Sequence, residues 1–245
     1  MRLLPLALVS LLALPARAFS PEELTALDAL YARRDEAAAA QALEDRLGRA
    51  LEAAPEDFEL LWRASRLRQW QAVGAGEKAR RLLGKQAWEL GDRARQANPA
   101  RVEGPYFAAL GLGLYAQAVG VLTALGEGLE ARFIERLDAA IRINPMYERG
   151  GPLLVKGRYY YELPCPKRDL KKSAALLRQV LSQHPERLRA RLYLAETLLE
   201  EGRAEEAREV FFPMTGAREV ADPPEGLRVQ ASARQVRTRI EAALE

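Results

Sequence analysis

Two pairs of side chains are the candidates for chemistry or ligand binding in this chain. The first pair, Cys165 and His184, unites the one thiol and the one imidazole, which a nucleophilic enzyme would need together. Cys165 stands between two prolines, and no third group is placed to orient the imidazole. One Cys and one His are also too few ligands for a typical zinc site. We therefore predict that the protein is not an enzyme and uses no metal or cofactor.

The second pair, Arg158 and Glu196, carries opposite charges at equivalent positions of two consecutive repeated segments. We expect the two side chains to lie side by side on adjacent helices. Two interpretations stay open at this point. Arg158 is free to bind a carboxylate of a ligand or partner through its planar N–H donors. Alternatively, the two charges neutralise each other and fix how the helices stack, because an unpaired charge in apolar surroundings is costly.

The elements that position these side chains are amphipathic helices that end at regularly spaced prolines. Intervals of 40 to 46 residues separate Pro55, Pro99, Pro145 and Pro185, and each block between them reads as two helices with a turn. No alternating strand pattern of convincing length interrupts them, so the predicted fold is all-α. A small or β-branched residue stands five positions before each proline: Ala50, Ala94, Ala140 and Val180. The expected helices cover 20–33, 37–53, 56–70, 77–97, 107–117, 129–143, 147–162, 170–183, 187–201, 204–211 and 225–244.

One of these hairpins has the spacing of a tetratricopeptide (TPR) repeat. Counting from Ala195, Gly202 lies seven residues on, Ala207 twelve and Phe211 sixteen. Such a hairpin cannot shield its own apolar face, so hairpins stack into a solenoid. We predict about five hairpins and a C-terminal capping helix in a single domain over 19–245. Its parts would be an N-terminal hairpin at 19–55, TPR-like repeats at 56–212, and a loop and capping helix at 213–245.

The first residues have the pattern of a secretory signal peptide. Met1 and Arg2 precede an apolar run too short to span a bilayer, and Ala16-Arg17-Ala18 gives a cleavage site after Ala18. This pattern predicts a soluble periplasmic or secreted protein, not an integral membrane protein. Without the leader, the chain's basic and acidic residues nearly balance, so its overall charge favours neither nucleic acid nor anionic lipid as a partner. With Cys165 as the only cysteine, the exported chain would contain no internal disulfide.

Several local motifs resemble the TatT family of periplasmic TPR-like proteins associated with TRAP transporters. They are Asn144-Pro145, Gly150-Gly151-Pro152-Leu153, Gly157-Arg158-Tyr159-Tyr160 and Leu194-Ala195-Glu196-Thr197. The similarity covers roughly residues 60–211. It implies an α-helical solenoid that binds the substrate-binding protein of a transporter, with a path for an apolar ligand.

The TPR register predicts which side chains line the concave face of the solenoid. The central position is the residue that directly follows the small residue at the helix contact. The other two positions lie four residues before and three residues after this central position. We expect a largely apolar groove with a few charges, lined by Leu61, Arg68, Leu112, Tyr115, Leu154, Arg158, Tyr161, Leu192, Glu196 and Leu199.

The function predicted from the sequence is binding. The occupant of the groove would be another envelope protein, such as a transporter's substrate-binding protein, or a small apolar or carboxylate ligand. The alternative is a structural scaffold or assembly factor in the bacterial cell envelope, acting through its convex face or terminal helix. The sequence leaves the oligomeric state open, a homo-oligomer included.

Overall fold

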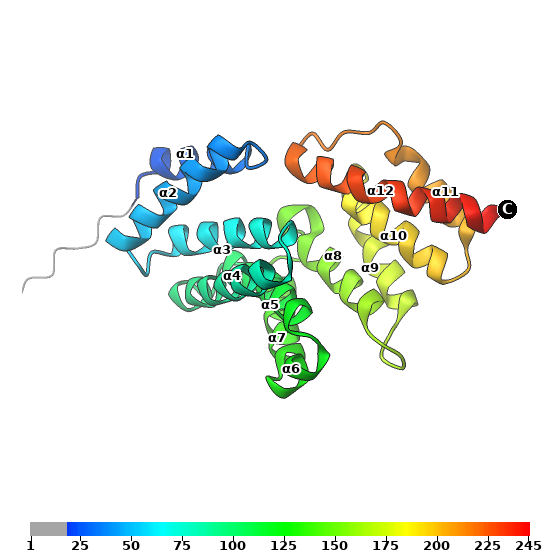
Figure 1. Ribbon diagram of the computed structural model, residues 1–245, viewed down its shortest axis with the longest axis horizontal. Helices are drawn as coiled ribbons and strands as arrows, with labels where there is room; N and C mark the ends of the chain where they lie inside the picture. Colours follow the sequence, from blue (N-terminus) through cyan, green and yellow to red (C-terminus); the bar gives the residue numbers. More distant parts are fainter. Residues whose placement is uncertain (1–18) are drawn as a thin grey trace, which may run out of the picture.

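The structure, a computed structural model, describes residues 19–245, and the predicted signal peptide at 1–18 lies outside them. Within the described range the chain is built from α-helices without strands (Figure 1), which confirms the predicted all-α, TPR-like helical-hairpin solenoid. The helices are α1 (Pro21–Tyr31), α2 (Ala37–Ala53), α3 (Phe58–Val73), α4 (Glu77–Ala97), α5 (Glu103–Val119), α6 (Val121–Gly126), α7 (Leu129–Ile143), α8 (Tyr147–Glu162), α9 (Leu170–Gln183), α10 (Leu188–Glu200), α11 (Ala204–Phe211) and α12 (Pro223–Leu244), with a 3-10 turn at Phe212–Met214.

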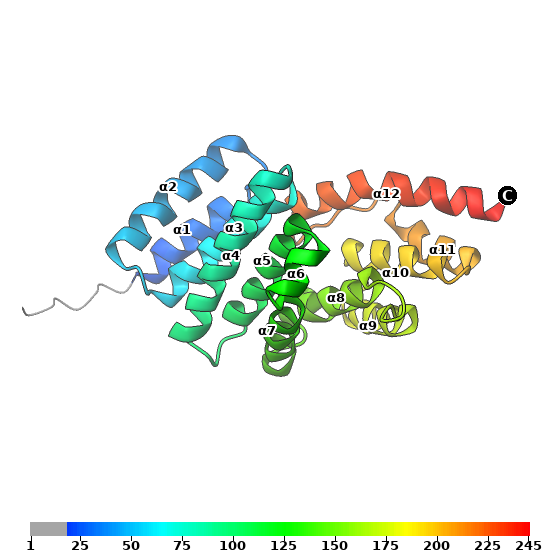
Figure 2. The same cartoon turned by 60° about the horizontal axis from the view of Figure 1, so that its bottom comes forward.

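Neighbouring helices pair into hairpins in the order of the sequence. The pairs are α1 with α2, α3 with α4, α5 with α7, α8 with α9, and α10 with α11. The two views in Figures 1 and 2 show α12 lying along α10 and α11, where it packs Val229, Val236 and Ile240 into the core. The short helix α6, inserted between α5 and α7, is an element that the sequence pattern did not predict.

The recurring residues before each proline complete a helix and pack into the core. Ala54, Asn98, Asn144 and His184 each donate a backbone hydrogen bond to the carbonyl oxygen four residues earlier. A proline after these caps cannot continue the helix, so the chain turns there. The acceptor residues, all buried against a neighbouring helix, are Ala50, Ala94, Ala140 and Val180. The regular spacing of prolines in the sequence therefore marks a recurring structural feature, the end of the second helix of a hairpin.

Close contact between α4 and α5 depends on glycine. A Cβ atom at Gly91 would meet the backbone of Ala108, and one at Gly111 would meet the backbone of Trp88. Since no side chain larger than hydrogen fits at these two positions, the two helices approach with backbone against backbone. This contact fixes the centre of the N-terminal half of the solenoid.

The buried side chains form separate clusters on the two sides of α8. Helices α1 to α7 contain three smaller clusters, and α8 to α12 contain one large cluster. At the start of α8, Glu148, Arg149 and Gly150 all have left-handed backbone angles. This conformation costs a residue with a Cβ atom about 1–2 kcal/mol. Arg149 is held by an ion pair with the buried carboxylate of Glu219, which tethers this bend to the C-terminal half.

The C-terminal part of the chain returns to the first hairpin. Figure 1 shows the first turn of α12 facing the loop that joins α1 and α2. Nη2 of Arg34 donates hydrogen bonds to both carboxylate oxygens of Asp222, at 2.7 and 2.8 Å. Residues 188 positions apart in the sequence therefore close the two halves against each other.

Candidate functional site

Arginine and tyrosine side chains alternate across the faces of α8 and α10. The guanidinium of Arg158 lies 4.4 Å from the ring centre of Tyr161 and 4.6 Å from that of Tyr193. The guanidinium of Arg168 also packs on Tyr161, at 4.8 Å from its ring centre, and that of Arg189 packs on Tyr193 at 5.6 Å. These are distances at which a cation is attracted to the face of an aromatic ring. We call these five residues the C-terminal ladder.

Helical periodicity explains why these side chains meet. On α8, Arg158 and Tyr161 are three residues apart, and on α10 Arg189 and Tyr193 are four apart, so each pair shares one face of its helix. Glu196 continues the face of α10 by another three residues. Because the hairpins α8–α9 and α10–α11 stack in the same orientation, the two faces come together.

Carboxylates balance each cation of the C-terminal ladder. Nη1 of Arg158 donates to Oε2 of Glu196 at 2.5 Å, so the two side chains lie side by side as the sequence predicted, and Glu162 also contacts Arg158. Burial works to lower the pKa of Arg158, but Tyr193 and the two carboxylates outweigh it and raise the pKa. The remaining pairs of the ladder are Arg189 with Glu225 at 2.8 Å and Arg168 with Glu200 at 3.3 Å.

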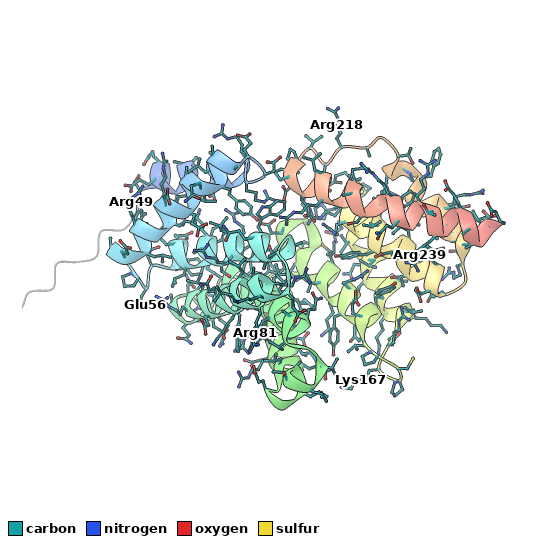
Figure 3. All side chains as sticks on the ribbon, in the orientation of Figure 1. Arg49, Glu56, Arg81, Lys167, Arg218 and Arg239 are labelled. Atoms are coloured by element: carbon teal, nitrogen blue, oxygen red, sulfur yellow. The ribbon has the colours of Figure 1, made fainter. Side chains whose placement is uncertain are left out.

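The face that carries the C-terminal ladder is partly open to solvent. The side chain of Arg158 keeps 28% of its exposure and that of Glu196 keeps 17%. Arg239 of α12, labelled in Figure 3, reaches across this face and donates to Glu200 at 2.7 Å. An open, shallow depression lies at the Arg168 end and is lined by Arg168, Asp169, Leu170, Lys171, Glu201 and Arg203.

A second stack of arginines and aromatic rings lies where α1, α3 and α12 meet. The guanidinium groups of Arg34 and Arg228 both pack on the ring of Trp70, at 4.1 and 3.1 Å from its ring centre. The guanidinium groups of Arg34 and Arg66 pack on the ring of Tyr31 in the same way, at 4.1 and 3.8 Å from its ring centre. We call these five residues the junction ladder, because they join the first two hairpins to α12.

The electrostatics of the junction ladder differ from those of the C-terminal ladder. Arg228 donates to the backbone oxygen of Trp70 at 3.0 Å, and no ion pair of Arg228 occurs among the described residues. Burial lowers the pKa of Arg228 to about 10, with Arg34 adding to the effect and Glu225 opposing it. Burial also raises the pKa of Tyr31 to about 12. Neutral rings and a desolvated cation are thus packed together here.

The structure separates the predicted groove residues into three groups. Arg158, Tyr161 and Glu196 come together on the partly exposed face, and Leu199 lies half-buried on the same helix as Glu196. Arg68 binds Glu44 of α2 at 2.6 Å. The other predicted residues are buried in the packing between helices: Leu61, Leu112, Tyr115, Leu154 and Leu192.

Three residues of the C-terminal ladder were missed by the register rule. Tyr193 and Arg189 follow from the sequence once the helical face through Glu196 is extended backwards by three and then four residues. Arg168 stands in the loop between α8 and α9, where no periodicity applies. It is held in place by donation to the backbone oxygen of Tyr161 at 2.9 Å.

Cys165 and His184 lie at opposite ends of α9, which at 14 residues separates them by about 20 Å. Cys165 is exposed, and His184 caps the helix beside Glu186 at 3.6 Å. Over 19–245, no group of three or more His, Cys, Asp or Glu is arranged to hold a metal ion. Over the same range, no helix combines the length and apolar character needed to cross a membrane.

Comparisons with known proteins agree with this architecture. Residues 167–226 match the sequence profile of the tetratricopeptide repeat family. Among solved structures, a thermophilic TPR protein of Thermus thermophilus is similar, with a TM-score of 0.63 and 23% identity over 87% of this chain and 96% of its own. A sequence search of curated proteins found no match. The fold of this chain is therefore that of a TPR-like α-solenoid, and its tetratricopeptide pattern is recognised over α9 to the start of α12.

Proposed function

We propose that this protein is a binding scaffold that captures a carboxylate-bearing, extended segment of a partner protein on the C-terminal ladder. TPR-like folds are typical of proteins that bind other proteins, and this supports a binding role in general. The proposal is based mainly on Arg158, which is partly exposed and lies between Tyr161 and Tyr193. A guanidinium fixed between two rings loses little conformational freedom when it binds a carboxylate.

The ladder supports binding because its charges can exchange partners. Glu162 is half exposed, so its contact with Arg158 is screened by water and contributes little to stability. An incoming carboxylate can take the place of Glu162 while Glu196 remains. The tyrosine rings beside it offer apolar area with polar tips, a combination that is enriched at protein interfaces.

The predicted leader and the resemblance to the TatT family support a more specific version of this proposal. The protein would be exported to the periplasm and the partner would be the substrate-binding protein of a TRAP transporter. Cell fractionation of the producing bacterium tests the first part, and copurification of that substrate-binding protein with wild type but not Arg158→Gln tests the second. Recovery of the protein from the cytoplasm with its first 18 residues intact would contradict the export.

A peptide selection tests the general proposal without knowledge of the partner. Peptides would be selected from a random display library on the purified protein, and each selected peptide would be synthesised with its Asp and Glu replaced by Asn and Gln. We expect the selected sequences to be rich in acids and the amide versions to bind about tenfold more weakly, the loss typical of one charged hydrogen-bonded contact. Selected peptides without carboxylates, or equal affinity of both versions, would overturn the proposal.

A further inference from the structure

The tip of the α5–α7 hairpin exposes a group of aliphatic side chains. On α6, Val121, Leu122 and Leu125 keep 73%, 87% and 63% of their exposure. Positions 121, 122 and 125 fall within one third of the helix circumference, so the three side chains form one apolar face. Scattered exposed leucines need no explanation, but a contiguous aliphatic face at a protruding tip does.

The tip is anchored so that this face must point outward. Ala124, on the other side of α6, packs with Val119 against the cluster of Leu112, Tyr115 and Leu129. Gly120 and Gly128, with positive φ of 80° and 62°, form the bends on either side of α6. The fold of the hairpin therefore keeps the apolar face exposed, because turning it inward would break the packing of Ala124 and Val119.

Basic side chains of α4 lie beside the tip. Gly84 of α4 faces Tyr115 of α5, and the two helices run antiparallel, so the register brings Lys78 and Arg81 to the end of α5 where α6 begins. In Figure 3, Arg81 points outward from α4 on the side of α5 and α6. Lys78 and Arg81 are exposed, and neither forms an ion pair within the described residues.

The basic groups near the tip outnumber the acidic ones, because Arg80 of α4, which donates to the backbone oxygen of Ala75, adds a third cation to Lys78 and Arg81. Glu77 precedes Lys78 at the start of α4, where a carboxylate is favoured by the helix dipole. Glu127, directly after α6, accepts a hydrogen bond from the Tyr115 hydroxyl at 3.4 Å. The free cations and the apolar face of α6 therefore lie together at one end of the hairpin.

We propose that the α6 tip docks the protein on an anionic lipid surface. Three aliphatic side chains are far from the ~800 Å² per partner that a stable protein interface buries, which argues against a second copy of this chain. They suit a shallow insertion at the boundary of headgroups and acyl chains, where aliphatic and basic groups act together. Lys78 and Arg81 would bind the lipid phosphates. The C-terminal ladder lies on other helices and stays free for its partner.

Vesicle sedimentation tests this proposal. The probes are vesicles of phosphatidylcholine alone and of phosphatidylcholine with an equal amount of phosphatidylglycerol. Wild type should bind the mixed vesicles and be released by salt. The variant with Val121→Ser, Leu122→Ser and Leu125→Ser should partition about tenfold less. Lys78→Glu with Arg81→Glu should lose about fivefold per residue, and on mixed vesicles only.

Matched controls distinguish docking through the α6 tip from nonspecific adsorption of other exposed apolar side chains and from misfolding. Val220→Ser with Leu227→Ser removes two side chains that are 88% and 64% exposed on the loop before α12 and on α12 itself, and it should bind vesicles as wild type does. Circular dichroism of each variant should match that of wild type. The proposal is overturned if wild type does not bind mixed vesicles, if the serine variant binds equally well, or if the tip instead mediates a dimer that the serine variant disperses.

Discussion

The C-terminal ladder and the junction ladder use the same unit, a guanidinium stacked on an aromatic ring, in different surroundings. In the junction ladder, Arg34 keeps 3% of its side-chain exposure and its carboxylate partner Asp222 comes from the far end of the chain. In the C-terminal ladder, Arg158 keeps 28% and its partner Glu196 comes from the next hairpin. The first arrangement holds distant segments together, whereas the second leaves a cation within reach of another molecule.

The two ladders also differ in how they neutralise charge. Each arginine of the C-terminal ladder has a carboxylate neighbour, and Arg158 has two. In the junction ladder, Arg34 and Arg66 have carboxylate partners, but Arg228 has only a backbone oxygen and the face of Trp70 among the described residues, and burial lowers its pKa. A spare carboxylate can be exchanged for that of a ligand, but a desolvated arginine packed on a ring cannot move without loss of stability. We therefore assign recognition to the first ladder and closure of the fold to the second.

The largest expected effect is the loss of stability on breaking the junction ladder. Arg34→Ala leaves Asp222 without its cation and removes packing from Tyr31 and Trp70, so we expect the free energy of unfolding to fall by about 3 kcal/mol. Arg158→Ala, the matched change in the other ladder, should cost about 1 kcal/mol because its pair is partly exposed. Urea unfolding measures both. Equal losses would erase the distinction between the ladders.

The bend that joins the two halves should be more sensitive than a similar turn in the C-terminal hairpin. Gly150 has φ of 81°, and a Cβ atom there would lie 2.9 Å from the methyl groups of Val180. Gly202, with φ of 74°, has open space. We expect Gly150→Ala to cost about 2 kcal/mol and Gly202→Ala about 1 kcal/mol. Thermal unfolding gives the order, and the reverse order would contradict a tightly held bend.

A charge swap distinguishes the two roles left open for Arg158. The variants are Arg158→Glu, Glu196→Arg and the double variant, with stability and binding of a selected acidic peptide measured for each. We expect the double variant to recover about 1 kcal/mol of coupling energy. Peptide binding should remain weak, because the cation has moved to α10. Recovery of both would show that the pair is structural and would remove the ligand role.

The smallest expected effect is a dependence of stability on acid pH at the junction ladder. Burial works to raise the pKa of Asp28, but hydrogen bonds and charge from Arg63 and Arg66 outweigh it and hold the pKa below its ordinary value. The resulting stability is present above the unfolded-state pKa of about 3.9 and is lost as the pH falls through the lower folded-state pKa. Asp28→Asn should flatten this loss in urea unfolding below about pH 4. An unchanged pH profile would contradict the account.

The helical hairpins were predictable because their signals are local. Ser20 caps α1 in a capping box with Glu23. Six helices end directly before a residue that is followed by proline: α2, α4, α7, α8, α9 and α11. The contact of Arg158 with Glu196 followed from equal positions in stacked repeats. Helix periodicity and repeat spacing were enough for these features because both are properties of a short stretch of chain.

The rest of the site depends on contacts that no local pattern encodes. Arg34 and Asp222 meet across almost the whole chain, and neither belongs to a repeat position. Glu148 and Arg149 have left-handed backbone angles at the start of α8 although neither is glycine, the residue type that would have predicted this conformation. Leu112 was assigned to a groove by the register, but neighbouring helices bury it completely. Tertiary packing decides these features.

We infer that the C-terminal ladder recognises carboxylates while the junction ladder holds the fold. Calorimetric titration of a selected acidic peptide into wild type, Arg158→Gln and Arg234→Gln tests this division of roles, with urea unfolding of each protein measured alongside. Arg234 is an exposed arginine of α12 and serves as the matched control. We expect that Arg158→Gln alone loses about tenfold in affinity while its free energy of unfolding falls by no more than about 1 kcal/mol. Unchanged affinity of Arg158→Gln, or an equal loss in Arg234→Gln, would contradict it.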